Sequence, residues 1–198
     1  MQLRRTALVV VGLLVTTPLA GQNEFKSWPL GQAPQELRPA ISRADRVVVA
    51  MQDTFVRELT DALSRGGATG AINSCHLDAT AIAQRVGREE GIAAGRTSDR
   101  LRSPTNAPRP WAADLVKTYA GRPASSVDGF AVDLGDKVGV LRPIPMRPMC
   151  AGCHGPDDQL APEVKGVLKD QYPSDHATGF GVGEIRGWFW VELPQQRR

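Results

Sequence analysis

The chain has 198 residues, of which 41% are hydrophobic and 23% are charged, proportions that are typical of a globular protein and exclude a disordered one. Its 24 basic and 21 acidic residues give a net charge of only +3, and no run of Lys or Arg indicates binding to nucleic acid. A single domain of this length can bury a sizeable core.

The N-terminus is typical of a secretory signal peptide. Arg4 and Arg5 precede an apolar run at 7–15, and small residues follow it. We expect cleavage near Ala20, which removes two arginines and no acid and lowers the net charge from +3 to +1. An uncleaved membrane anchor is the alternative, but a bilayer span needs about 20 apolar residues. The sequence therefore predicts a signal peptide at 1–20, a periplasmic or secreted location, and no stable membrane insertion after cleavage.

Two helices are predicted in the first half of the chain. Residues 21–38 are rich in Gly, Pro and Gln, and we expect them to form a loose leader. From residue 39 the apolar residues recur every three or four positions, which predicts a helix over 39–63. The glycine-rich segment 64–70 would end this helix, and a second is expected over 71–88.

The middle of the chain changes from helical to strand periodicity. The proline-punctuated segment 95–110 is expected to be a long loop, and Pro110 is well placed to begin a short helix over 111–119. Two strands at 130–134 and 137–146 are predicted to form a hairpin.

The C-terminal part adds a predicted helix at 163–170 and a strand at 183–193 that is rich in β formers. Helices followed by strands indicate an α+β domain over 39–194, with an antiparallel sheet flanked by N-terminal helices.

The segment 150–154, Cys-Ala-Gly-Cys-His, has the spacing and order of a c-type haem attachment motif. Two thiols one short turn apart can each add to one haem vinyl group. The next residue then lies under the iron, where its imidazole is an axial ligand. We expect Cys150 and Cys153 to form thioether bonds to one covalent haem c, and His154 to ligate its iron.

Two other uses of the cysteine pair stay open. Zinc needs four ligands, which Cys150, Cys153 and His154 could supply together with Cys75 or His76. A disulfide between the two cysteines forms readily in the periplasm, but it leaves His154 without a role.

The iron face opposite His154 has two candidate protein ligands. Cys75 lies at the centre of the apolar stripe of the second predicted helix, whereas His76 is turned about 100° toward the flank. A free cysteine is ordinarily a small buried hydrophobe, and histidine is the more conventional iron ligand. We expect Cys75 as the sixth ligand, with His76 as the second choice and a vacant or water-bound position as the third.

Four motifs occur along the chain in a definite order. They are AINSC at 71–75, GRTSDRLRSPTNAPRPW at 95–111, CAGCHG at 150–155 and YPSDHATGFGVGEIRG at 172–187. In these motifs the chain resembles the PAS-like single-haem c domain family, found as a lone exported protein and as the sensor region of bacterial signalling proteins. The resemblance covers roughly 41–194. It implies a PAS-like α+β fold with covalent haem c, whose iron is held by His154 and by Cys75.

The resemblance also suggests a role for the arginine-rich loop. Haem propionates are anionic, and arginine matches carboxylate geometry with paired hydrogen bonds. Arg96, Arg102 and Asn106 are therefore candidate propionate contacts, with a solvated surface loop as the alternative. Ser103 and Ala112 depart from the residues that are usual in the family at these positions.

Three functions follow from these residues. A cysteine–histidine pair favours ferric iron, because thiolate stabilises the higher charge. Reduction could then free a site for a diatomic gas, so the first expectation is an exported sensor of redox state or of a small gas that acts on a separate signalling protein. The alternative is a periplasmic electron-transfer cytochrome with a redox partner. No His/Arg constellation indicates a peroxidase, and we do not expect an enzyme.

Overall fold

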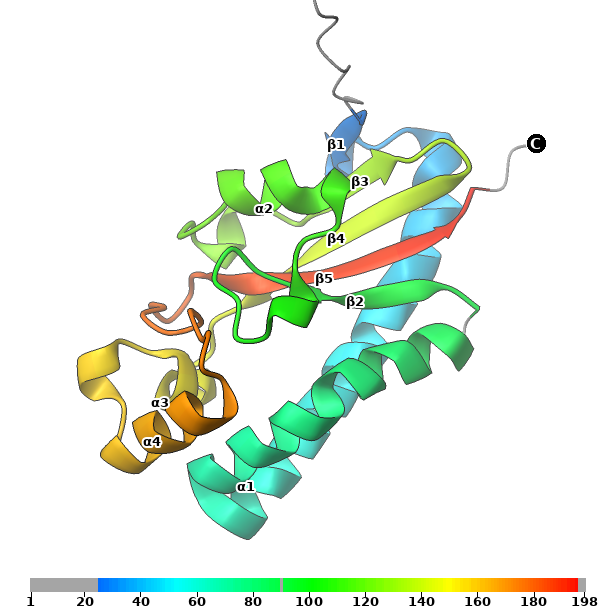
Figure 1. Cartoon of the computed structure of the whole chain (residues 1–198). Helices are drawn as coiled ribbons and strands as arrows, with labels where there is room; N and C mark the ends of the chain where they lie inside the picture. Colours follow the sequence, from blue (N-terminus) through cyan, green and yellow to red (C-terminus); the bar gives the residue numbers. More distant parts are fainter. Residues whose placement is uncertain (1–24, 90, 196–198) are drawn as a thin grey trace, which may run out of the picture.

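The computed structural model describes residues 25–89 and 91–195, without the side chains at 74–80, 82 and 89. The signal peptide expected at 1–20 lies outside these residues. In the described part, a five-stranded antiparallel sheet carries helices on both faces, as Figure 1 shows. This is the α+β architecture expected from the sequence.

The strand order in the sheet is β1-β3-β4-β5-β2. The strands are β1 (Ser27–Pro29), β2 (Ala93–Thr97), β3 (Phe130–Asp133), β4 (Lys137–Pro145) and β5 (Ile185–Pro194). The helices are α1 (Arg38–Glu89), α2 (Ala113–Thr118), α3 (Ala151–His154) and α4 (Pro162–Gln171).

Each face of the sheet packs on a different helix because side chains alternate along the strands. On one face, Val140 of β4 and Val191 of β5 belong to a buried cluster that contains residues of α1. On the other face, Leu141 of β4 and Trp188 of β5 pack with Val116 of α2. The sheet is therefore the central layer of the molecule.

Helix α1 is a pair of helices joined at a glycine break. Gly66 and Gly67 leave the helical conformation. The φ of Gly67 is 59°, a backbone angle that residues other than glycine adopt only under strain. At this point the chain reverses direction (Figure 1). Met51 before the break and Val86 after it belong to the same buried cluster on the sheet. The two helices predicted from the sequence are confirmed, with a break narrower than 64–70.

Two segments expected to be irregular form the edge strands instead. In the expected leader at 21–38, β1 pairs with β3 and Leu37 is buried, so the prediction of a loose segment is wrong for 27–37. In the expected loop at 95–110, the first residues belong to β2, which pairs with β5. Neither segment has enough β formers to be recognised as a strand from the sequence. Both are held in the sheet by hydrogen bonds to the neighbouring strand.

The connection between β4 and β5, residues 146–184, carries the CxxCH motif and is called the attachment segment below. Two backbone hydrogen bonds, both 2.8 Å, join the two ends of this segment beside the sheet. The Met146 N–H donates to the Glu184 carbonyl, and the Gly183 N–H donates to the Met146 carbonyl. Both α3 and α4 of this segment contact α1. The long β4–β5 pair thus anchors the motif beside the second half of α1.

The remaining predictions for the elements agree with the structure. A short helix follows Pro110, β3 and β4 form a hairpin, α4 covers the predicted 163–170, and β5 ends the domain. None of the described helices is long and apolar enough to cross a membrane.

Candidate functional site

Cys150, Cys153 and His154 lie on one compact turn of helix. A 3-10 turn at Pro148–Cys150 leads directly into α3. The helix ends at Gly155, whose N–H donates to the Ala151 carbonyl at 2.9 Å. A Cβ at Gly155 would lie 2.6 Å from that carbonyl oxygen, so only glycine ends the turn in this way.

The loop after α4 fixes the His154 ring. Nδ1 of His154 lies 2.7 Å from the Ala177 carbonyl oxygen. Because a carbonyl only accepts, Nδ1 must donate its proton, and Nε2 is left with the lone pair that can bind a metal. The main chain is fixed as well, since the Phe180 N–H donates to the His154 carbonyl at 3.0 Å. Orientation of a ligand histidine by a backbone carbonyl is a common feature of metal sites.

Burial and nearby positive charges favour the neutral form of the His154 imidazole. Burial lowers its pKa well below the ordinary value, and the positive charges of Arg186, Arg102 and Arg96 lower it further, against the opposing effect of the hydrogen bond to Ala177. The neutral ring is the form that ligates metals.

Arg102 ties the attachment motif to the loop that holds His154. Its Nε donates to Asp175 Oδ2 at 3.1 Å, and its Nη2 donates to the Cys153 carbonyl at 2.5 Å. The other carboxylate oxygen of Asp175 accepts from the Ala177 N–H at 2.7 Å. Arg102 and Asp175 thus support the carbonyl that orients His154. The contact between Arg102 and a propionate stays a prediction.

The other two candidates from the loop have different surroundings. Arg96 on β2 stacks over the Phe55 ring at 4.0 Å, and its charge acts on His154. Asn106 lies in a 3-10 turn where its N–H donates to the Ser103 carbonyl, and none of its described contacts reaches His154. The charge of Arg96 thus reaches the site, and the contact between Asn106 and a propionate stays a prediction.

Cys75 and His76 are on the second half of α1, and their side chains lie outside the described residues. Ile72, one turn before Cys75, is buried in a cluster with Leu160 and other residues of the attachment segment, and Cys153 packs against this cluster. The helix that carries Cys75 thus contacts the segment that carries His154. The ligand prediction is consistent with this contact and stays a prediction.

Arg186, on β5, is a site residue that was not predicted as one. Its Nη2 lies 3.5 Å from His154 Nε2, and its Nε is buried without a hydrogen-bond partner in the described structure. Burial and the charges of Arg102 and Arg96 lower the pKa of Arg186 to about 9. Its position within the motif at 172–187 is the sequence signal that could have identified it.

The alternatives to haem have little support among the described residues. Cys150 is a free thiol, so a disulfide with Cys153 is not formed. In the parts of the chain whose side chains are described, no three His, Cys, Asp or Glu residues gather as a metal cluster, so zinc would depend on side chains beyond them.

The residues present fit a haem with anionic carboxylates. The two thiols and the neutral histidine share one turn, and three arginines face this histidine while Asp175 is the acidic partner of one of them. The Nε of Arg186, which is buried without a hydrogen-bond partner in the described structure, matches a group that brings negative charge into the site.

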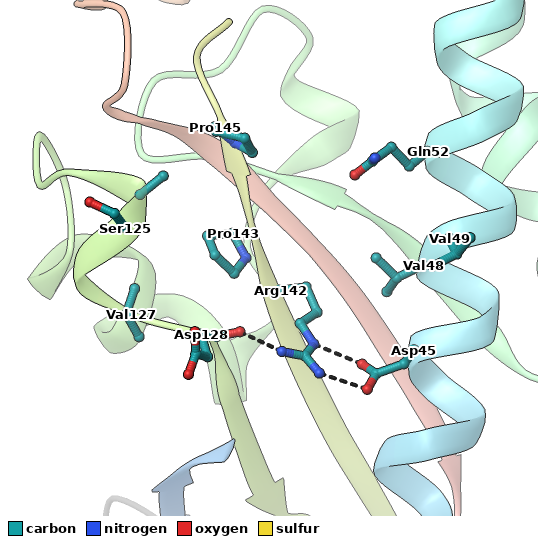
Figure 2. A pocket seen from close by; sticks show the side chains of 11 residues that line it. Asp45, Val48, Val49, Gln52, Ser125, Val127, Asp128, Arg142, Pro143 and Pro145 are labelled. Atoms are coloured by element: carbon teal, nitrogen blue, oxygen red, sulfur yellow. Dashed lines mark hydrogen bonds and ion pairs between the residues drawn. The ribbon is translucent and has the colours of Figure 1, made fainter. Parts of the chain in front are cut away.

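A hollow of about 620 Å³ lies between the first half of α1 and β4 (Figure 2). Arg142 crosses it, donating to both carboxylate oxygens of Asp45 at 2.6 and 2.7 Å and to the Asp128 carbonyl at 2.7 Å. His154 and the two motif cysteines are not among its lining residues. The hollow is therefore separate from the attachment site.

The fold and the site define an α+β domain that carries a CxxCH turn with an oriented histidine, as the motifs suggested. A family model described as Tll0287-like matches residues 32–194, and the chain belongs to this family. The match begins inside the expected leader, in agreement with the packing of that segment.

A solved structure described as the cyanobacterial heme-protein Tll0287 has the same fold. The TM-score is 0.56 at 19% sequence identity, over 84% of this chain and 99% of that chain. At this identity the likeness establishes the fold alone. The comparison with curated proteins gives no match.

Proposed function

We propose that this protein is an exported carrier of one covalent haem c, held through Cys150 and Cys153 and ligated by His154. The observation that carries the proposal is the Nδ1 contact of His154 with the Ala177 carbonyl, which leaves Nε2 available beside the two cysteines. Each thiol would add across one vinyl group, so that an S–C bond forms and the thiol proton passes to the other vinyl carbon. No oxidant is needed. The family to which the chain belongs, with a member described as a heme-protein, supports this cofactor.

The protein's own residues would orient the ligand histidine and balance charge. Ala177 fixes the imidazole plane, and the Arg102–Asp175 pair fixes Ala177 and the Cys153 carbonyl. A bound haem would supply a one-electron iron couple and a coordination position for a second protein ligand. We propose Cys75 for that position, with His76 as the alternative.

We propose that the role is sensing of redox state or of a small gas. The second half of α1 contacts the attachment segment near Ile72 and packs on the sheet near Val86. A change of ligation at Cys75 would therefore act on a helix that touches both parts. A separate signalling protein would be the partner.

Electron transfer is the second candidate. Gly152 is exposed and Cys150 and Cys153 are only partly buried, so the edge of an attached haem would lie near the surface. Such exposure favours electron exchange with a redox partner. Neither role requires catalytic residues, and we propose a binding protein in the periplasm rather than an enzyme.

Optical spectroscopy of the haem-loaded protein tests the proposed ligands. Cys75→Ser is expected to change the ferric spectrum, because an oxygen ligand or none would replace a thiolate, and His76→Ala is the matched control on the next residue. If Cys75→Ser leaves the ferric spectrum unchanged and His76→Ala alters it, histidine is the ligand instead.

Carbon monoxide distinguishes the two roles. For a sensor, reduction should free the position opposite His154, and carbon monoxide should then bind and shift the absorption of the reduced protein. A reduced protein that keeps both ligands and ignores carbon monoxide contradicts gas sensing and favours the electron carrier.

A further inference from the structure

Arg186 has no acidic partner of its own in the described structure. Its side-chain contacts are with His154 Nε2 at 3.5 Å and with the Phe180 ring at 5.0 Å, and its Nε is buried without an acceptor. A buried guanidinium with unused donors is costly, so a group that accepts from it would stabilise the site.

Arg100 provides the comparison, because it stacks on the same Phe180 ring, at 3.5 Å. Unlike Arg186, it donates to the Thr178 carbonyl at 2.9 Å and lies 3.7 Å from the carboxylates of both Asp99 and Glu184. Two arginines thus share one aromatic ring, and one of them is satisfied by the protein alone.

The one hydrogen-bond acceptor of Arg186 disappears when His154 binds iron. Nδ1 of His154 carries the proton that is donated to Ala177, so Nε2 has a single lone pair. That lone pair can accept from Arg186 or bind a metal, but it cannot do both. Iron ligation therefore leaves the Arg186 guanidinium without an acceptor among the described residues.

The carboxylate of Asp175, which lies near Arg186, is already paired with another arginine. Asp175 binds Arg102 at 3.1 Å, and both side chains are largely buried. Arg96 and Arg102 add positive charge around Arg186 rather than an acceptor. An anionic group of the cofactor would supply the acceptor that the Arg186 guanidinium lacks, and a haem carries two carboxylates.

We propose that Arg186 donates to a propionate of the bound haem. This inference rests on the proposed attachment of haem at Cys150 and Cys153. The fork of donors on a guanidinium matches a carboxylate, and such charge-assisted pairs are among the stronger hydrogen bonds in proteins. Arg186 thus joins Arg96, Arg102 and Asn106, the propionate contacts that the sequence suggested, as a candidate from a different part of the chain.

Resonance Raman spectroscopy of the haem-loaded protein tests the assignment, because the propionate bending bands report hydrogen bonding at the carboxylates. Arg186→Gln is expected to shift one propionate band to lower frequency, since its charge-assisted donors are lost. Arg100→Gln is the matched control, and it should leave both bands at their wild-type positions because Arg100 is satisfied by protein groups.

The outcomes separate this inference from the proposed function. Wild-type protein without covalent haem contradicts the function itself, whereas haem-loaded Arg186→Gln with unshifted propionate bands overturns only the role of Arg186. Should Arg186→Gln fail to mature, a crystal structure of the wild-type holoprotein decides instead. A propionate oxygen within hydrogen-bond distance of the Arg186 guanidinium supports the assignment, and a guanidinium that contacts protein groups alone overturns it.

Discussion

Some residues of this site can be predicted from the sequence, whereas others contribute through contacts that only the fold creates. The CxxCH spacing predicts Cys150, Cys153 and His154 without a structure, because attachment chemistry fixes that spacing. Arg186 could not be predicted in this way, since its role depends on where β5 meets the attachment segment. The Asp175–Arg102 pair is likewise visible only once residues more than seventy positions apart are brought together.

Asp175→Asn should loosen the loop that orients His154. Asp175 accepts from Arg102 and from the Ala177 N–H, and it is largely buried, so we expect a loss of about 2 kcal/mol in the free energy of unfolding. The ferric haem spectrum should also change, because the imidazole is held less firmly. Asp157→Asn, in an exposed pair with Lys165, is the control and should cost under about 1 kcal/mol. Equal losses in the two variants contradict the positioning role.

Glu192 should make the stability depend on pH. Burial alone would raise its pKa, but hydrogen bonds from Arg109 and Trp111 outweigh burial and lower the pKa below the ordinary value. A carboxylate with a lowered folded-state pKa stabilises the fold above its unfolded value, near 4.3, and this contribution is lost as the pH falls through the folded pKa.

The corresponding variant is Glu192→Gln, measured by chemical denaturation. At pH 7 we expect it to lose about 2 kcal/mol relative to wild type, and the difference should shrink as the pH falls below the unfolded-state pKa, near 4.3. Glu163→Gln, at an exposed position on α4, should have little effect at either pH. A wild-type advantage that stays constant down to the acid range argues against a charged Glu192.

At the scale of elements, the sequence predicts the long periodic segments and misses the short ones. The helical stripe of α1 and the hairpin β3–β4 carry enough residues to show their periods. β1 has three residues, and β2 has the sequence Ala-Ala-Gly-Arg-Thr, in which Gly95 is required because a Cβ there would lie 2.5 Å from the Trp190 ring. These two strands form because they pair with β3 and β5, and such pairing cannot be seen in the periodicity of the sequence.

The break in α1 can be tested with two adjacent glycines. Gly67 has a φ of 59° and Gly66 a φ of −143°, and a Cβ at either position would meet no atom within 4 Å. Gly67→Ala should therefore destabilise the protein by about 1 kcal/mol through backbone strain alone, whereas Gly66→Ala should be close to neutral. Denaturant titration of both variants provides the measurement, and equal stability of the pair would show that the chain does not reverse through a left-handed Gly67.

At the scale of the whole molecule, three parts meet at the attachment site. The sheet holds the ends of the attachment segment, the returning half of α1 packs beside it, and the loop after α4 orients His154. The class of fold and the attachment motif could be predicted from the sequence, as could the broad division into helices and strands. The role of each arginine could not, because it depends on long-range packing.

The central claim is that haem is bound covalently through the two motif cysteines. Its most direct test is the mass of the intact protein under denaturing conditions, after export from cells that mature c-type cytochromes. We predict the mass of the chain plus one haem for wild type, and the mass of the bare chain for the double variant Cys150→Ala/Cys153→Ala. A wild-type protein with the mass of the bare chain would contradict the account.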